Sequence, residues 1–132
     1  LFTVKALKAN LVEKGRNPED YVMITSQNPI VGRTDAEAYE KYKEITSFGP
    51  YSRIPVPLFM GSAEKVADKV QQWYKSGAAD MFMIRQDHPG GLQDFVDLVV
   101  PILQERGIFR TEYESDTLRG HLELPKPAFR KV

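Results

Sequence analysis

The sequence contains no cysteine, and its formal net charge at neutral pH is zero. The absence of cysteine excludes disulfide frameworks, thiolate nucleophiles and Cys-ligated metal sites. It also fits a reducing compartment, so we expect a cytoplasmic protein. Without a basic excess, the chain has no electrostatic footprint for nucleic acid or for an anionic membrane. Since no apolar run approaches the ~18 residues of a transmembrane helix, we expect neither nucleic acid nor a membrane among its partners.

Several familiar signatures are also missing. The two histidines, His88 and His121, lie far apart without a patterned carboxylate, so no metal site is expected. There is no Ser-His-Asp signature and no G-x-G-x-x-G motif. The opening stretch LFTVKALKAN lacks the apolar core and cleavage site of a signal peptide. It also lacks an initiating Met, which predicts a fragment or a processed product.

The residues that are present describe one globular domain with a modest core. Apolar residues make up 42% and charged residues 27% of the 132 positions. The hydrophobic pattern alternates between helical and extended periods along the chain. It predicts helices over 1–14, 34–46, 62–76 and 92–106, and strands over 21–25, 56–60 and 79–84.

Particular residues set the expected ends and character of these elements. Thr34 and Glu37 form a capping box, in which each side chain bonds the other residue's backbone N–H. Pro101 lies inside the last helix and should bend or weaken it. The strand YVMIT (21–25) is apolar throughout, as in a parallel sheet that is buried on both faces.

The alternation of strands and helices predicts an α/β fold with parallel strands. Three strands are too few to close a sheet or to bury 21–25 on both sides. The chain therefore reads as an incomplete part of a larger sheet or barrel.

The candidate site consists of polar residues that follow two of these strands. In α/β folds, ligands bind outside the carboxyl ends of parallel strands. An arginine there could hold a phosphate or carboxylate, and a histidine could donate a hydrogen bond or pass a proton. The alternatives are a polar surface loop after the later strand and turn chemistry after the earlier one. The candidates for contacting a cofactor or substrate are Arg85, Gln86, Asp87, His88, Thr25, Ser26 and Gln27.

Three weaker features have simpler interpretations. Gly32-Arg33-Thr34 and Gly61-Ser62 could each hold a phosphate at a helix N-terminus, but capping already explains both. Trp73-Tyr74 is interpreted as core packing rather than as a stacking platform.

Longer motifs carry a family resemblance. The run from Gly61 to Pro127 contains EKVAD, GAAD, PGG followed by DFVDLVVP, FRTEYE and LRGHLELPKP, and upstream lies VGRTDAEA. It resembles the C-terminal portion of the large components of two-component FMN-dependent monooxygenases. These form the nitrilotriacetate, pristinamycin and dibenzothiophene-sulfone group of the bacterial luciferase-like superfamily.

The resemblance implies a TIM-barrel-like fold of which this chain supplies the last βα units, with 79–84 as the eighth strand. It implies that a flavin reductase delivers reduced FMN, which reacts with O2 to oxygenate a small organic substrate. Residues 1–107 would form the partial luciferase-like unit and 108–132 a C-terminal extended arm. The family's flavin-contacting residues lie mostly earlier than this chain, so no catalytic residue is carried over.

Departures from the family pattern leave alternatives open. The family usually has a long insertion between the Ala-Glu-Ala helix and Gly61, where this chain has only SFGPYSRIPVPLFM. Before Gly90 the family is often more apolar than Arg85-Gln86-Asp87-His88. We expect a C-terminal fragment or shortened homologue that is inactive alone. The alternatives are a non-catalytic homo-oligomeric assembly module, or a relative that binds flavin without oxygenating a substrate.

Overall fold

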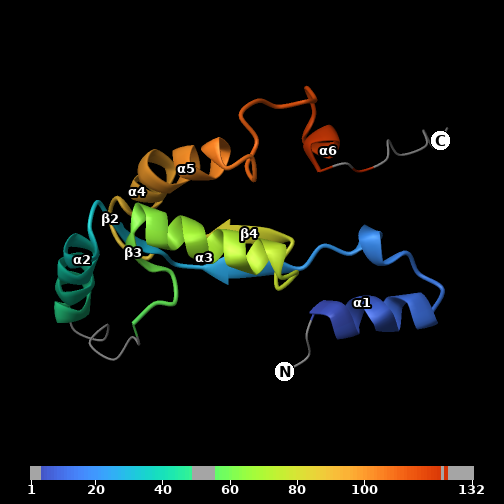
Figure 1. The fold of residues 1–132 in the computed structure, drawn as a ribbon, viewed down its shortest axis with the longest axis horizontal. Coiled ribbons are helices and arrows are strands. Elements are labelled where there is room, and N and C mark those ends of the chain that lie inside the picture. The colour runs from blue at the N-terminus through green and yellow to red at the C-terminus, as the bar shows by residue number, and fades with distance from the viewer. Residues whose placement is uncertain (1–3, 49–55, 123, 125–132) are drawn as a thin grey trace, which may run out of the picture.

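The structure is a computed structural model that describes residues 4–48, 56–122 and 124. Helices and strands alternate through most of the chain, as the sequence predicts (Figure 1). In chain order the elements are α1 (Val4–Glu13), η1 (Pro18–Asp20), β1 (Ile24–Gln27), β2 (Ile30–Gly32), α2 (Asp35–Ser47), β3 (Met60–Ser62), α3 (Ala63–Lys75), β4 (Met81–Ile84), α4 (Gly91–Asp94), η3 (Phe95–Val99), α5 (Val100–Glu105) and α6 (Leu118–His121).

The strands form two short parallel pairs, which confirms the predicted strand direction. β1 pairs with β4, with Ile24 opposite Met81 and Gln27 opposite Ile84. β2 pairs with β3, with Val31 opposite Gly61. Among the described residues no barrel closes, in agreement with the incomplete fold expected from the sequence.

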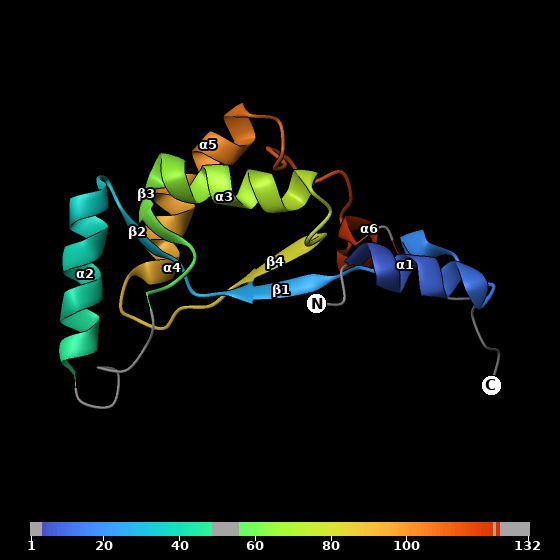
Figure 2. The ribbon, with the colours of Figure 1, turned by 60° about the horizontal axis from the view of Figure 1, so that its bottom comes forward.

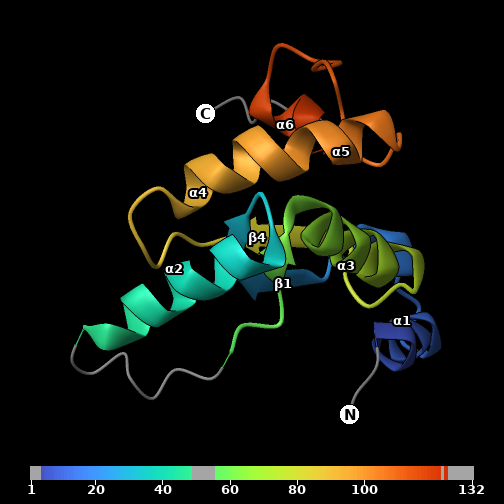
Figure 3. The same cartoon turned by 60° about the vertical axis from the view of Figure 1, so that its left-hand side comes forward.

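Helices cover one side of the β1–β4 pair. Figure 2 shows α3 and the α4–α5 helix on that side of the strands and no helix on the other. α2 and the start of α4 lie at the same end of the molecule (Figure 3). Among the described helices, those that cover this sheet therefore lie on a single face of it.

The first strand differs from its predicted form. It covers Ile24–Gln27 rather than 21–25, and exposed and half-buried residues alternate along it. The prediction of burial on both faces is wrong for this structure, because the described helices pack on one face only. β2 was not predicted as a strand, since three residues are too short to show a period.

The start of α2 confirms half of the predicted capping box. Thr34 Oγ1 accepts a hydrogen bond from the Glu37 N–H at 3.1 Å. The Glu37 carboxylate, however, accepts from the backbone N–H of Arg33, at 2.9 Å, and not from Thr34. This bond, helped by Lys41, lowers the pKa of Glu37.

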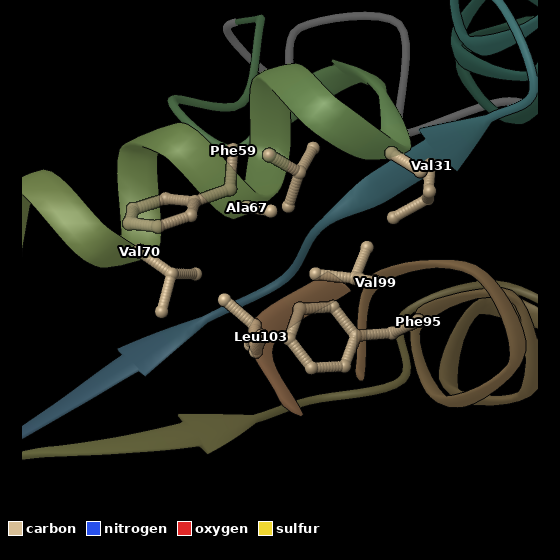
Figure 4. Packing of buried hydrophobic residues seen from close by; sticks show 9 residues of the cluster. Val31, Phe59, Ala67, Val70, Phe95, Val99 and Leu103 are labelled. Carbon is tan, nitrogen blue, oxygen red and sulfur yellow. The ribbon is translucent and has the colours of Figure 1, made fainter. Parts of the chain in front are cut away.

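The core lies between α3, the last helix and the two strand pairs. Phe59, Val66 and Val99 are among its most deeply buried side chains. The ring of Phe59 packs edge-on against Trp73, with centroids 5.3 Å apart, so Trp73 is a packing residue as predicted. The same prediction is wrong for Tyr74, which is 52% exposed. Figure 4 shows the core, whose buried members are Val31, Phe59, Ala63, Val66, Ala67, Val70, Phe95, Val99 and Leu103.

The last helix contains a π-helical segment, η3, immediately before Pro101. Its backbone bond from the Val100 N–H to the Phe95 carbonyl spans five residues. Proline has no N–H to continue the α-helical ladder, and a π segment is one way in which a helix accommodates this loss. The predicted local weakening therefore takes the form of a wider turn.

The segment after residue 107 is less irregular than predicted. α6 forms within it, and Thr117 caps this helix by accepting from the Gly120 N–H at 3.1 Å. Of the predicted extended stretch 124–129, only Leu124 falls within the described residues. The division of the chain at residue 107 stays a prediction. No described helix combines the length and the apolar character needed to cross a membrane.

Candidate functional site

The two predicted polar segments meet at the carboxyl ends of β1 and β4. Because the strands run in parallel and in register, residues 25–27 lie beside 82–84. The ladder continues one step further, where the Arg85 N–H donates to the Gln27 carbonyl at 2.7 Å. The two segments, which are far apart in sequence, therefore share one rim of the sheet.

Asp87 links the two segments through its carboxylate. One oxygen accepts a hydrogen bond from Asn28 Nδ2 at 2.9 Å. The other lies 3.4 Å from Arg85 Nη2. Arg85 itself is largely exposed, which leaves most of its guanidinium donors open to solvent or to an anionic group.

His88 is turned back toward the start of α4. Its Nδ1 lies 3.1 Å from the Pro89 carbonyl, so Nδ1 carries the proton that this bond needs. Its Nε2 is buried and has no hydrogen-bond partner. A Cβ placed on Gly91 would lie 2.6 Å from Nε2, which shows how closely the ring rests on that glycine.

The register divides the three candidates of β1 between the two faces of the sheet. Thr25 and Gln27 lie beside Phe82 and Ile84, whose side chains pack against the core. Gln27 Nε2 donates to Thr25 Oγ1 at 2.9 Å, so the two candidates satisfy each other on the helix-covered face. Ser26 alone lies on the opposite face, because successive side chains of a strand alternate.

That opposite face carries residues that the sequence analysis did not single out. Ile24 and Ser26 of β1 lie beside Met81 and Met83 of β4. Alternation places Arg85 on the same side, at the carboxyl end. Counting every second residue from Ser26 would have predicted this face. The runs YVMIT and MFMI conceal the alternation, because they are apolar at successive positions.

A hollow of about 490 Å³ opens between α2 and the loop after β4. Its walls combine charged and apolar side chains, including Lys41, Phe48 and His88. A second, narrower hollow beside it is lined in part by Asn28, Tyr42 and Pro57. Asp87 and His88 border both, so the candidate rim continues into a concave surface.

Lys41 holds one wall of this hollow in place. Its Nζ donates to the Val31 carbonyl and to Asp94 Oδ2, each at 2.9 Å, and lies 3.1 Å from Glu37 Oε1. Partial burial opposes the charged form of Lys41, but the bonds to Asp94 and Glu37 outweigh it and raise its pKa. These contacts fasten α2 to the start of the last helix.

The weaker phosphate-site candidates are occupied by the chain's own groups. The Arg33 N–H is bonded to Glu37, as described above. The Ser62 N–H donates to Asp35 Oδ1 at 2.7 Å, and Ser62 Oγ caps α3 by accepting from the Lys65 N–H. The hydrogen bond from the Ser62 N–H, together with Lys65, lowers the pKa of Asp35. The contacts of Asp35 with Ser62 and Lys65 therefore hold the starts of α2 and α3 together, whereas the Arg33–Glu37 bond is local to α2.

His121 lies away from this rim, stacked on the ring of Tyr113 with centroids 4.3 Å apart. The residues described by the structure contain no group of three or more His, Asp or Glu side chains placed to hold a metal ion.

Sequence comparison relates the chain to several monooxygenases, although no protein-family model matches it. It is 53% identical over 74 residues to N-acetyl-S-(2-succino)cysteine monooxygenase of Bacillus subtilis, covering 55% of this chain and 17% of that protein. It is 49% identical over 73 residues to dibenzothiophene-sulfone monooxygenase of Rhodococcus erythropolis, covering 54% of this chain and 16% of that protein.

A longer, weaker match includes most of the chain. A pristinamycin IIA synthase component from Streptomyces pristinaespiralis is 28% identical over 178 residues, covering 92% of this chain and 42% of that protein. Because this alignment is longer than the 132 residues of the chain, the relative has additional residues within the matched region. The chain thus spans less than half the length of each of these relatives.

Solved structures show the same relationship at the level of the fold. The crystal structure of long-chain alkane monooxygenase superposes with a TM-score of 0.77 at 28% identity, covering 91% of this chain and 37% of that chain. EDTA monooxygenase from Chelativorans sp. BNC1 superposes with a TM-score of 0.72 at 25% identity, covering 92% and 43%. In sequence and fold, the chain is therefore similar to a part of the luciferase-like FMN-dependent monooxygenases.

Proposed function

We propose that this chain contributes the rim of two adjacent strands to the pocket of a flavin-dependent monooxygenase. Such an enzyme uses reduced FMN and O2 to oxygenate a small organic substrate. The observation that carries the proposal is the identity of about one half over 73 to 74 residues to monooxygenases that act on different substrates. The meeting of the two polar strand ends supports it, because that is where α/β enzymes place their ligands.

The residues present fit a flavin. The face formed by Ile24, Met81 and Met83 is uncharged, which suits a flat aromatic ring system. Arg85, at the carboxyl end of that face, has donors for a phosphate or carboxylate. When bound, reduced flavin supplies the electrons for the reaction with O2.

Three rim residues have a role in this proposal. Arg85 binds the anionic part of the cofactor or substrate, and Asp87 orients the guanidinium. His88 borders the hollow, and a turn of its ring that releases Nδ1 from the Pro89 carbonyl would bring a ring nitrogen to the hollow as a proton acceptor. The hollow between α2 and the loop after β4 is open to solvent, and its volume of about 490 Å³ is within the size range of small-molecule sites.

The proposal extends to partners and location. A separate flavin reductase delivers reduced FMN to the assembled protein, in the cytoplasm. One observation favours a second function, that of a homo-oligomeric assembly module, because an apolar face of the β1–β4 sheet is uncovered in the described chain. The expected inactivity of the isolated chain is compatible with both.

The test is a graft that places residues 61–127 of this chain, which carry β4 and the rim residues Arg85 to His88, in N-acetyl-S-(2-succino)cysteine monooxygenase in place of its similar segment, while that enzyme supplies the strand that pairs with β4. With a flavin reductase, FMN and that enzyme's own substrate, we expect oxygenation that depends on reduced flavin. Arg85→Ala should raise the KM for flavin or substrate, whereas the matched control Arg106→Ala, at the far end of the last helix, should leave it unchanged.

The outcome also separates the alternatives. A folded graft that binds FMN but consumes no O2 in a substrate-dependent way would contradict the oxygenase proposal and favour a flavin-binding module. A folded graft that binds no flavin would leave assembly as the function of this segment.

A further inference from the structure

The hollow between α2 and the loop after β4, here called the α2 hollow, has an uneven charge. It lies at the end of the molecule where α2 and the start of α4 are found (Figure 3). Its charged lining consists of one lysine and three carboxylates, namely Lys41, Glu44, Asp87 and Asp94. Two negative charges are therefore left without a positive charge in the lining.

Lys41 has no hydrogen-bond donor to offer to a ligand in this hollow. An ammonium group has three N–H donors. Those of Lys41 are engaged by the Val31 carbonyl, Asp94 and Glu37, at 2.9, 2.9 and 3.1 Å. An anion in the hollow would therefore meet the repulsion of the carboxylates without gaining a bond to the lysine.

The carboxylates keep acceptors for a ligand. Within the described part of the chain, no hydrogen bond or ion pair engages the side chain of Glu44. Asp94 uses one oxygen, Oδ2, for Lys41. Just outside the hollow, Glu37 and Arg85 carry opposite charges and leave the negative excess unchanged. The hollow therefore suits a group that donates hydrogen bonds and carries a positive charge.

The remaining lining is mostly apolar and includes an aromatic ring. Phe48 is 64% exposed, and Ile45 and Pro89 add aliphatic surface. A cation is attracted to the face of an aromatic ring, and proteins use such rings to recognise organic ammonium groups. The lining therefore matches a ligand in which an ammonium group is attached to an apolar body.

We propose that the α2 hollow binds an organic amine as its ammonium ion, with the charge near Glu44 and the apolar body against Phe48 and Ile45. The inference rests on the proposed function in one respect, because that function makes the bound amine the substrate. The face assigned to the flavin shares no residue with this hollow, so the two ligands do not compete.

The binding of matched probes to the full chain tests the proposal without flavin or O2. Benzylammonium, phenylacetate and benzyl alcohol share a benzene ring and carry a positive, a negative and no charge. Each is titrated at about pH 7.5, where histidine is ordinarily neutral, and the backbone amide shifts are followed by NMR. The shifts give both the Kd and the place of binding.

The expected result depends on the charge of the probe and on one carboxylate. Benzylammonium should bind at least ~5-fold more tightly than phenylacetate, with the largest shifts in the second half of α2 and in the loop after β4. Glu44→Gln should weaken the binding of benzylammonium by ~2–5-fold and leave that of benzyl alcohol unchanged. Glu40→Gln is the matched control, because Glu40 is on the same helix, pairs with Lys43 and does not line the hollow. It should leave all three affinities unchanged.

Other outcomes would overturn the proposal. Phenylacetate that binds as tightly as benzylammonium would show that the hollow does not select a cation. Equal losses in Glu44→Gln and Glu40→Gln would assign the effect to the net charge of the chain. Shifts confined to another region, or no shifts at millimolar benzylammonium, would show that the hollow is not a site for amines. A failed oxygenation graft would not bear on these results, since residues 61–127 do not contain α2.

Discussion

The contact between Gly91 and the His88 ring can be tested with Gly91→Ala. This substitution should change the free energy of unfolding in opposite directions with and without the ring. The three atoms nearest to a Cβ on Gly91 all belong to the His88 ring, at 2.6, 2.9 and 3.1 Å. Contacts under 3.0 Å require the ring to move, which makes Gly91→Ala an overpacking substitution. Such substitutions cost ~1–3 kcal/mol.

A second effect of the substitution acts in the opposite direction. Alanine reduces the freedom of the unfolded chain, which stabilises by ~0.4–1 kcal/mol where the backbone conformation permits it. Gly91 has no positive φ, so its conformation permits alanine. In the native background the clash should win, and Gly91→Ala should destabilise by roughly 1 kcal/mol.

His88→Ala removes the ring and with it the clash. In that background Gly91→Ala should stabilise by ~0.4–1 kcal/mol, so the effect changes sign. The assay is urea unfolding of the native chain, both single variants and the double variant, followed by circular dichroism. If Gly91→Ala had an effect of the same sign and size in both backgrounds, His88 would not rest on Gly91, and the burial of Nε2 against this glycine would be contradicted.

Three further predictions concern the hydrophobic core, the stability of the protein at acid pH and the rim. Phe59→Ala should destabilise by ~3–5 kcal/mol in urea unfolding, because Phe59 is 2% exposed, whereas Phe48→Ala, at a side chain that is 64% exposed, should change stability by less than ~0.5 kcal/mol. Equal effects would contradict the assigned core. Asp35→Asn should destabilise at neutral pH, and the difference should shrink as the pH falls below about 4, since the folded pKa of Asp35 is lowered from 3.8 and its contribution is lost on protonation; a difference that is constant with pH would refute this link. Asp87→Ala should cost ~0.2–1 kcal/mol, because it removes a half-exposed contact to Asn28; no loss in thermal unfolding would mean that the contact does not order the rim.

Local signals in the sequence predicted the helices well. The Thr34 and Ser62 caps depend on residues three positions away, and both bonds are present. The alternation of elements and the parallel strand direction also agree with the structure. These features follow from short-range chemistry, which is visible in one sequence.

Features set by pairing between distant segments were predicted less well. The first strand was predicted to begin at residue 21, but β1 begins at Ile24, because it starts where it pairs with the first residue of β4. The same register decides that Ser26 lies on the uncovered face of the β1–β4 sheet and Thr25 does not. The Glu37 carboxylate bonds Arg33 rather than Thr34, a choice that depends on side-chain geometry and not on spacing. That the two rim segments touch flavin or substrate stays a prediction.

The central claim is that this chain forms part of the pocket of a flavin-dependent monooxygenase, and isotope transfer tests it most directly. The graft of residues 61–127 would be supplied with reduced FMN and isotopically labelled O2, and the product analysed by mass spectrometry. The account predicts one labelled oxygen atom per product molecule, which disappears when reduced flavin is omitted. A folded graft that binds FMN and yields unlabelled product, or no product, would contradict the claim.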